Sequence, residues 1–294
     1  MRVGAASAAK LLAQRIDLVA DPRPVVDMLT ELCLDMAWCA EEAGAREEAE
    51  RLEEPVCIVL RRELSELHRL GRVAPYVFNS SSEYMLQGAA FMEPRDSAEV
   101  RAEKDGLSQL QGYLHVLQQL TPEDFEALCA GMLYELGVQD PHLTRRTGDE
   151  GIDFYGRLKL EGLLTANSVS PGVERQLSVW MIGQAKRYYA SAASTSHIRE
   201  LVGAVELAKG QAFGSHGESY IEPRIRVCDP VFCLIFTTGR IALNAWRLIE
   251  KSGVIGMDGM MVAAFLSSRV TSTIPGDTVE ERVGAWLSKF LRPN

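Results

Sequence analysis

The residue types best suited to metal-assisted chemistry lie in the second half of the chain, at Asp153, Gln184 and Lys186. Hydrolysis of a phosphodiester needs a divalent ion, an activated water and stabilisation of the departing oxygen. Magnesium prefers oxygen ligands, so at least one carboxylate has to face a partly open site. Asp153 suits this role because it follows the turn Gly148-Asp149-Glu150-Gly151, whose two glycines permit close approach of the backbone to a phosphate.

Gln184 and Lys186 are two residues apart in a predicted strand. Side chains alternate along a strand, so these two project to the same face while Ala185 points away. The Lys186 ammonium is suited to orienting an attacking water, lowering its pKa or neutralising charge on the phosphate. The Gln184 amide offers a neutral metal ligand or a group that positions water. Glu126, on the preceding predicted helix, completes an acidic site.

Each of these residues also has a structural interpretation. Asp153 could be a turn acid before a strand, and Lys186 could be a strand-end lysine whose ammonium reaches solvent. Glu126 could be a solvated first-turn acid favoured by the helix dipole. Asp149 suits bracing of the glycine turn better than it suits binding of metal.

Basic and aromatic residues beside these motifs are candidate contacts to DNA. Arg145 and Arg146 precede the glycine turn and are placed to contact phosphates. Arg187 and Tyr188 directly follow the predicted catalytic strand, where they could grip a phosphate and stack on a base. The alternative for Tyr188 is that its ring packs into the core.

The elements that must position these residues follow a recognisable order. Thr121-Pro122-Glu123-Asp124 is a strong helix start, with Thr121 as N-cap, and Gly137 closes that helix. Apolar patterns then predict strands at Leu143–Arg146, Ile152–Leu160, Leu177–Gln184, Val231–Thr237 and Val254–Met257. They predict helices at Ile198–Ala208, after the third of these strands, and at Ile241–Lys251, after the fourth. This order predicts an α/β domain with a mixed sheet flanked by helices.

Five segments of this region resemble, in the same order, those of the Mrr-type restriction endonucleases. The segments are Phe125-Glu126, Thr147-Gly148-Asp149-Glu150-Gly151-Ile152-Asp153, Gly183-Gln184-Ala185-Lys186-Arg187-Tyr188, Ile198-Arg199-Glu200-Leu201-Val202-Gly203-Ala204 and Thr237-Thr238-Gly239. The similarity extends over roughly residues 120–266. It departs from the family at Glu150, where a glycine is common, and in the longer link Glu161–Gln176.

The resemblance implies the restriction-endonuclease-like fold of the PD-(D/E)xK nucleases and cleavage of DNA that depends on Mg²⁺, with Mn²⁺ able to substitute. It implies metal binding by Asp153 and Gln184, a catalytic role for Lys186 and an accessory acidic role for Glu126. Cutting both strands of a duplex commonly needs two active sites, so we expect a homo-oligomer.

The first half of the chain is predicted to be mainly α-helical, and its chemistry is not legible. Apolar spacing predicts helices at Ala5–Ala20, Val25–Ala43, Val56–Leu70 and Asp96–Leu120, with a charged segment at Arg46–Glu54. No strand signals of a winged-helix DNA-binding domain are visible. We therefore assign residues 1–118 to sensing, to binding of a regulatory protein or ligand, or to oligomerisation, and residues 119–294 to the nuclease domain.

The net charge of −9 is unusual for a protein that acts on nucleic acid, but it is unevenly distributed. Residues 1–120 hold 13 Lys and Arg against 20 Asp and Glu, whereas residues 121–294 hold 18 against 20. Screening at cellular salt limits the reach of distant charges to about 8 Å, so a local basic patch in the second half can still bind phosphates.

Cysteine usage and hydropathy place the chain among globular proteins. The six cysteines form no CxxC pair, which favours buried free thiols over disulfides or metal ligands. The apolar runs are far too short for a membrane span, and charges within residues 1–20 interrupt any secretory signal. We expect a cytoplasmic protein that does not enter the membrane.

Three functions remain open at this level. The first is a DNA endonuclease of restriction or defence against foreign DNA, and the second is a repair or recombination nuclease that acts on branched or nicked DNA. The third is a DNA-binding module without turnover, which is suggested by the combination of Gln184 and Glu150.

Overall fold

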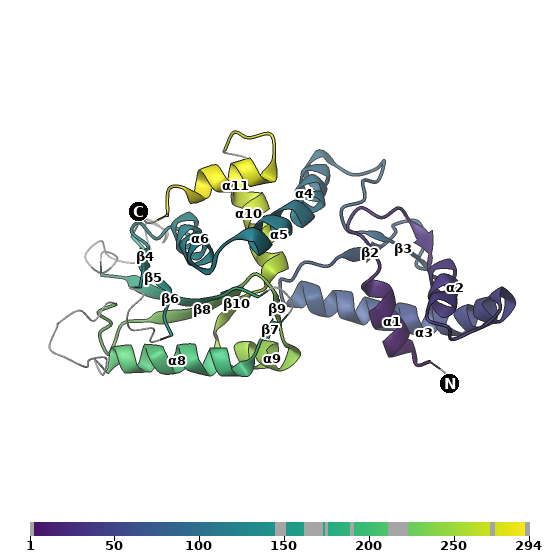
Figure 1. Cartoon of the computed structure of the whole chain (residues 1–294), viewed down its shortest axis with the longest axis horizontal. Helices are drawn as coiled ribbons and strands as arrows, with labels where there is room; N and C mark the ends of the chain where they lie inside the picture. The colour runs from purple at the N-terminus through teal and green to yellow at the C-terminus, as the bar shows by residue number, and fades with distance from the viewer. Residues whose placement is uncertain are drawn as a thin grey trace. The chain divides into compact units, whose positions relative to one another are not determined.

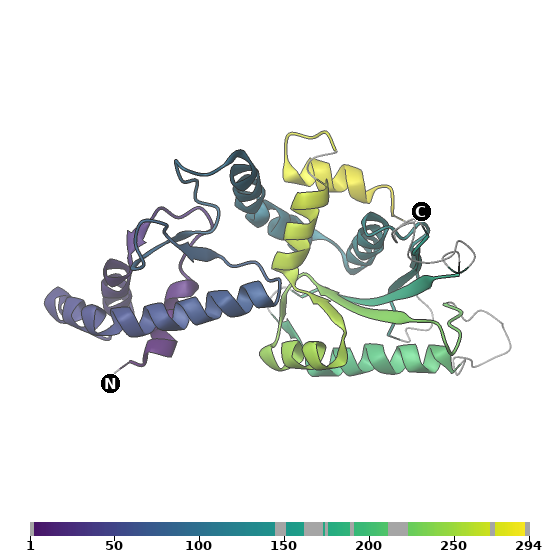
Figure 2. The same cartoon turned by 180° about the vertical axis from the view of Figure 1, so that it is seen from behind.

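The computed structural model describes residues 3–144, 151–161, 173, 176–188, 191–210, 223–270 and 274–291. The chain divides into two compact units, Met1–Leu110 and Gln111–Asn294. Figures 1 and 2 show both units from opposite sides. Within the described residues, no helix has the length and apolar character needed to cross a membrane.

The front unit combines helices with a small antiparallel sheet. Its elements are α1 (Ala5–Ala13), β1 (Arg23–Pro24), α2 (Val25–Asp35), α3 (Glu42–Arg69), β2 (Tyr76–Phe78), β3 (Met85–Gly88) and α4 (Ala98–Ser108). The sheet has the order β1-β3-β2, with Arg23 opposite Leu86 and Tyr76 opposite Gly88. The first three of these four helices, with one strand after the first helix and a hairpin after the third, have the connectivity of a winged-helix domain.

This half is mainly helical, as predicted, and it also contains strands for which no signal is visible in the sequence. Its three strands are two to four residues long, too short for an alternating pattern to be visible in the sequence. The predicted helix limits, however, were wrong: α1 ends at Ala13 and α2 ends at Asp35. The predicted helix over Asp96–Leu120 is divided at Gln109 into α4 and α5 (Leu110–Gln119).

Helix α3 contains the charged segment that the sequence placed outside a helix, and it continues through Pro55. Its buried face is an unbroken apolar stripe of residues that pack in the core of this unit: Ala45, Ala49, Leu52, Val56, Cys57, Leu60 and Leu64. Pro55 is exposed, so its ring lies on the solvent side of the helix, away from that core. The position at which proline lacks a backbone N–H lies on the same side. Tertiary packing along this stripe overrides the usual breaking effect of proline.

The rear unit is an α/β domain built on a five-stranded sheet. Its elements are α5 (Leu110–Gln119), α6 (Pro122–Glu135), β4 (His142–Leu143), β5 (Phe154–Lys159), β6 (Ser178–Lys186), β7 (Ala192–Ala193), α8 (Thr195–Lys209), β8 (Val231–Thr237), β9 (Arg240–Ile241), α9 (Leu243–Ser252), β10 (Ile255–Met257), α10 (Gly259–Val270) and α11 (Val279–Leu287). The sheet order is β10-β8-β6-β5-β4. Strands β10, β8 and β6 are parallel, whereas β5 and β4 are antiparallel to their neighbours. The predicted mixed sheet is confirmed.

Helices cover both faces of this sheet. Figure 1 shows α8 and α9 along one face and α6, α10 and α11 on the other. The face under α8 and α9 is a core of aliphatic residues that includes Ile182, Leu201 and Ile235. Helix α6 begins as predicted, because the Thr121 Oγ1 accepts a hydrogen bond from the Asp124 N–H at 3.1 Å, and Gly137 follows its end at φ 99°.

Strands β5 and β6 pack closely together at Gly183. Phe154 stacks against Phe236 with ring centroids 5.5 Å apart, and it lies directly over Gly183. A Cβ at Gly183 would lie 2.1 Å from the Phe154 ring, so no larger residue fits there without displacing the ring. This close packing fixes the start of β5 beside the end of β6, where the candidate site residues lie.

Candidate active site

Asp153 lies immediately before β5 and reaches across to β6. Its backbone N–H donates to the Gly183 carbonyl at 2.9 Å. Its carboxylate Oδ2 accepts a hydrogen bond from the Ala185 N–H at 2.7 Å, and only 8% of the residue is exposed. The carboxylate is therefore held on the backbone between Gln184 and Lys186, as a site built from all three residues requires.

Gln184 is completely buried, and one half of its amide has no partner. Its Nε2 donates to the Glu200 Oε1 at 3.1 Å, whereas its Oε1 has no hydrogen-bond partner among the described residues. This orientation is required, because the flipped amide would place two acceptors against each other. An unsatisfied buried acceptor destabilises a fold by about 1–3 kcal/mol. The Gln184 Oε1 is therefore suited to binding a cation or a hydrogen-bond donor.

Glu200, on α8, is the residue of this site that the sequence interpretation did not assign a role. It accepts the hydrogen bond from Gln184 and packs against Gly151, where a Cβ would lie 3.3 Å from the Glu200 Cγ. Gly151 has φ 81°, in the left-handed region that favours glycine. The glycine thus permits both the turn before Asp153 and the close approach of α8. The only signal in the sequence was that Glu200 lies within one of the five matching segments.

Lys186 ends β6 two residues after Gln184, and alternation along the strand places both on one face. Its backbone carbonyl accepts a hydrogen bond from the Thr238 N–H at 3.3 Å. The Lys186 side chain is partly exposed and forms no ion pair or hydrogen bond with a described residue. Its ammonium is therefore available to a ligand on this face.

Glu126 approaches the same region from α6, where its side chain is half-buried. Between α6 and the sheet lies the buried Cys129, whose pKa is raised first by burial and then by the carboxylates of Asp153 and Glu126. Both carboxylates therefore lie close to one thiol. Cys129 remains protonated. All six cysteines are free, but the prediction that they are buried was wrong for Cys228, which is exposed, and for Cys39 and Cys233, which are partly buried.

Of the candidate DNA contacts, Arg187 and Tyr188 are described, whereas Arg145 and Arg146 lie outside the described residues, as do Asp149 and Glu150. Arg187 follows β6, and its Nη2 donates to the Gln118 carbonyl at 3.2 Å. The DNA-contact roles of all four candidates stay predictions.

Tyr188 packs against the core under α8, and its ring lies against His197. The His197 Nδ1 accepts from the Ser194 N–H at 3.1 Å, so the ring proton is on Nε2, which donates to the Tyr188 hydroxyl at 2.9 Å. Burial, and then the nearby Glu200, raise the pKa of Tyr188. Tyr188 therefore remains a neutral phenol with its own O–H available to donate.

The oxygen donors of the site fit a hard divalent cation. The described residues contain no group of three His, Cys, Asp or Glu side chains arranged to hold a metal. The available set is instead a carboxylate at Asp153 and the unpartnered amide oxygen of Gln184. Magnesium commonly takes only one or two protein carboxylates and keeps several waters, so this sparse set of oxygens suits it.

Comparison with protein families finds a match in the region that contains the candidate site residues. Residues 117–214 match the Mrr_cat family model, described as a restriction endonuclease. Among curated protein sequences, none matches this chain.

Three solved restriction endonucleases are similar to the chain. MspJI in complex with a 27-mer oligonucleotide has 18% identity and a TM-score of 0.41, over 68% of this chain and 39% of that one. The DNA modification-dependent enzyme AspBHI has 23% identity and a TM-score of 0.40, over 72% and 46%. FokI bound to DNA has 10% identity and a TM-score of 0.32, over 97% and 47%. The matches span less than half the length of each of these proteins.

Proposed function

We propose that this chain is a Mg²⁺-dependent endonuclease that hydrolyses phosphodiester bonds in DNA, because residues 117–214 match the restriction endonuclease family model. One observation carries the proposal: the Asp153 carboxylate and the unpartnered Gln184 Oε1 lie on neighbouring strands. Lys186, on the same face as Gln184, adds a cation without a described partner.

Each residue has a role that follows from its contacts. A bound Mg²⁺ ion supplies charge stabilisation and Lewis acidity at a phosphoryl oxygen. Asp153 and Gln184 would hold the ion, and Glu200 holds the Gln184 amide through its Nε2, which leaves the Oε1 for a ligand. The Lys186 ammonium orients the attacking water and neutralises negative charge that develops on the phosphate. Glu126 adds negative charge from α6.

A plasmid cleavage assay tests this assignment. Wild type, Asp153→Asn and Lys186→Ala are incubated with supercoiled plasmid in Mg²⁺, in Mn²⁺ and in EDTA. Lys251→Ala, at an exposed lysine of α9, is the matched control. We expect cleavage by wild type and by the control with either metal, and none by the two site variants. If both site variants cut as fast as wild type, the assignment of the site is wrong.

The bond between Gln184 and Glu200 favours a second candidate, a DNA-binding module without turnover. A neutral amide stands on β6 where a carboxylate would be a stronger metal ligand, and it is already engaged by Glu200. Calorimetry distinguishes the two. Binding of DNA without binding of Mg²⁺ or Mn²⁺, together with no cleavage, would support the module instead of the nuclease.

We further propose that the biological role is restriction or defence against foreign DNA, with repair or recombination as the alternative. The fold and the site residues are compatible with both roles, so the substrate decides between them. Methylated, unmethylated, branched and nicked substrates of equal length are compared at one enzyme concentration. Preference for intact duplex with one modification state supports restriction, whereas preference for branches or nicks supports repair.

Cleavage of both strands needs two sites, so we propose a homo-oligomer as the active form and recognition of a partner or signal by the front unit. Sedimentation analysis and the dependence of the rate on enzyme concentration test the oligomer. A rate per monomer that is constant while the chain sediments as a monomer would contradict it.

A further inference from the structure

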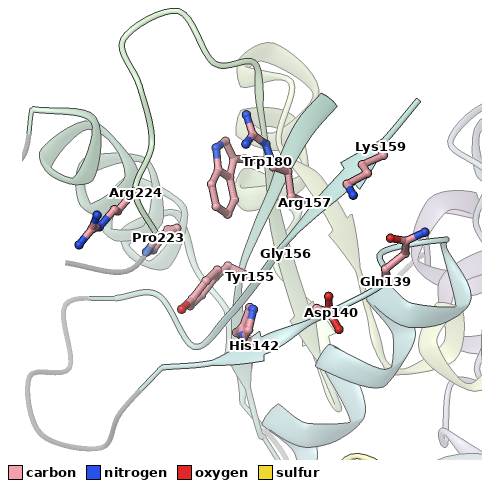
Figure 3. A pocket seen from close by; sticks show the side chains of 10 residues that line it. All are labelled: Gln139, Asp140, His142, Tyr155, Gly156, Arg157, Lys159, Trp180, Pro223 and Arg224. Atoms are coloured by element: carbon pink, nitrogen blue, oxygen red, sulfur yellow. The ribbon is translucent and has the colours of Figure 1, made fainter. Parts of the chain in front are cut away.

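A second hollow of the rear unit lies at the edge of its sheet, apart from the site described above. Strand β4 pairs with Phe154 and Tyr155, and among the described residues no strand covers the rest of β5 on that side. The space left there is a pocket of about 330 Å³ (Figure 3). Its lining is Gln139, Asp140, His142, Tyr155, Gly156, Arg157, Lys159, Trp180, Pro223 and Arg224.

Three aromatic rings form one side of this pocket. His142 stacks on Tyr155 with centroids 5.3 Å apart and ring planes at 29°, and Tyr155 lies 6.3 Å from Trp180. Figure 3 shows the rings of Tyr155 and Trp180 on the same side of the strands, facing the segment with Pro223 and Arg224. Tyr155 is buried, whereas Trp180 is half-buried and His142 is exposed. Aromatic surface is therefore available to a flat ligand.

The orientation of Trp180 is fixed by a buried carboxylate. The Trp180 Nε1 donates to the Asp229 Oδ2 at 3.0 Å, and Asp229 is only 8% exposed. The Arg226 guanidinium donates to the same carboxylate at 2.9 Å, and Arg157 approaches it at 3.5 Å. Arg157 also lies over the Trp180 ring, 5.3 Å from its centroid. The stacking surface is thus held in place before any ligand arrives.

The charge of the lining favours an anion. Arg157 is matched by Asp229, but Lys159 and Arg224 are exposed and form no ion pair with a described residue. The single carboxylate of the lining is Asp140. Two unmatched cations beside an aromatic surface offer a phosphate contact and a stacking contact together, and the carboxylate offers an acceptor for an exocyclic amine.

We propose that this pocket binds one nucleotide, with its base stacked on Trp180 and its phosphate held by Arg224, while Lys159 adds positive charge on the other side of that ring (Figure 3). The volume of about 330 Å³ lies at the lower end of the range typical of small-molecule sites, which suits a single nucleotide. Base–aromatic stacking tolerates any base, and Arg and Lys are the usual partners of phosphate. No part of the candidate metal site lines this pocket.

The nucleotide has two possible sources, a DNA strand or the free pool, and the position of the pocket favours the strand. Trp180 lies opposite Arg157, which is four residues beyond Asp153, a distance of about 13 Å along β5. A strand positioned at the candidate metal site could therefore place an unpaired nucleotide in the pocket. This choice of source rests on the proposed function, whereas the pocket and its ligand class do not.

The test measures binding by the full chain in EDTA, where metal-dependent cleavage does not occur. The probes are dAMP and dCMP by calorimetry, and a fluorescein-labelled single-stranded hexadeoxynucleotide and a blunt duplex by anisotropy. The variants are Trp180→Leu and the double variant Lys159→Ala/Arg224→Ala, which changes two exposed side chains and so protects the test against misfolding of the first. Arg247→Ala, an exposed arginine on α9, is the control.

We expect wild type to bind the nucleotides, and both test variants to bind about tenfold more weakly, the effect of losing one stacking or phosphate contact. The control should stay within about twofold. Tighter binding of the hexanucleotide than of the mononucleotides identifies the strand as the source, and equal binding identifies the free nucleotide. Both results support the pocket.

The inference is overturned if wild type binds no nucleotide up to about 10 mM, or if both test variants bind as wild type does. Its failure is distinguishable from failure of the nuclease proposal. Plasmid cleavage with unchanged nucleotide binding in the variants rejects the pocket alone. Nucleotide binding that depends on Trp180, in a chain that never cleaves DNA, rejects the nuclease alone.

Discussion

The two units differ in what they place in their interiors. Among the described residues of the front unit, Gln87 is the one buried polar side chain, and most of the ion pairs lie at the surface. The exception is the pair of Lys104 and Asp96, whose side chains are 13% and 11% exposed. The described part of the rear unit buries a larger polar set: Asp153, Gln184, Asp229, Thr237, Thr238, Asp258 and Ser267. The front unit is therefore held by an ordinary apolar core, and the rear unit contains groups that an apolar core would exclude.

The buried polar groups of the rear unit differ in turn in how well they are satisfied. Asp229 collects hydrogen bonds from Trp180 and Arg226, and Asp153 accepts one from Ala185. The Gln184 Oε1 has no partner in the described part of the chain. A satisfied buried carboxylate organises its neighbours, whereas an unsatisfied acceptor indicates a position completed by a ligand. The comparison thus separates a satisfied carboxylate at Asp229 from an unsatisfied acceptor at Gln184, in the proposed metal site.

The largest effect is expected at Asp153. Asp153→Asn retains an oxygen that can accept from the Ala185 N–H but removes the negative charge, so the strands stay together while the cation is held less well. We expect cleavage to fall by at least about 100-fold, with little change in the midpoint of thermal unfolding. Single-turnover nicking of plasmid measures it. A loss of activity that follows a loss of folded protein would instead make Asp153 a structural residue like Asp229.

A smaller effect is expected at Glu200, which acts through Gln184. Glu200→Gln weakens the hydrogen bond that orients the Gln184 amide, and loss of such an outer partner typically lowers metal affinity or activity about 10–100-fold. Calorimetric titration with Mn²⁺ provides a readout that a merely structural role would not change.

The matched control is Glu206→Gln on the same helix, whose carboxylate pairs with Lys209 at 2.9 Å. It should bind Mn²⁺ and cleave DNA as wild type does. Equal weakening by both substitutions would mean that α8 contributes general negative charge, and that Glu200 has no specific role at Gln184.

A feature of the fold or of the candidate site was predictable from the sequence where the residues that determine it are close together in the chain. Strand β8 has the predicted bounds Val231–Thr237, because a continuous apolar run between polar segments determines it locally. Helix α6 was predictable from Thr121 and Gly137, which act within one turn of its ends. The convergence of Asp153 and Gln184 could be anticipated because their segments occur in a familiar order.

The remaining features depend on contacts that no local pattern shows. Gln184 and Glu200 are 16 residues apart and meet only because α8 packs across the sheet. Trp180 and Asp229 are 49 residues apart, so the pocket beside them has no linear motif. Pro55 lies within α3 because the apolar stripe around it packs continuously, which a rule based on proline alone cannot foresee.

The stability of the rear unit should depend on pH through the buried carboxylate of Asp229. Its pKa is lowered, chiefly by the hydrogen bond from Arg226. A carboxyl whose pKa is lower in the folded than in the unfolded chain stabilises the fold above the unfolded pKa of about 3.9 and loses this contribution as pH falls below it. Asp229→Asn should therefore lower the free energy of unfolding by about 1–3 kcal/mol at pH 7, and by less near pH 3.

Urea unfolding at the two pH values measures this difference, with Asp140→Asn, at an exposed carboxylate, as the control. The control should unfold with wild type at both. A deficit for Asp229→Asn that is the same at pH 7 and pH 3 would show that shape, and not charge, accounts for the role of this side chain.

The smallest effect is expected in the front unit, at an ion pair that lies at the surface. The Arg15 Nη1 and the Asp35 Oδ2 are 2.6 Å apart, but the two side chains are 41% and 59% exposed. Arg15→Gln should lower the free energy of unfolding by less than about 1 kcal/mol, because water and salt screen such a pair. A double-mutant cycle with Asp35→Asn, at low salt and at 1 M NaCl, isolates the pair energy, which should vanish at high salt. A coupling above about 2 kcal/mol that persists in 1 M NaCl would contradict the contrast between the units, because the front unit would then depend on charge pairs as well as on its core.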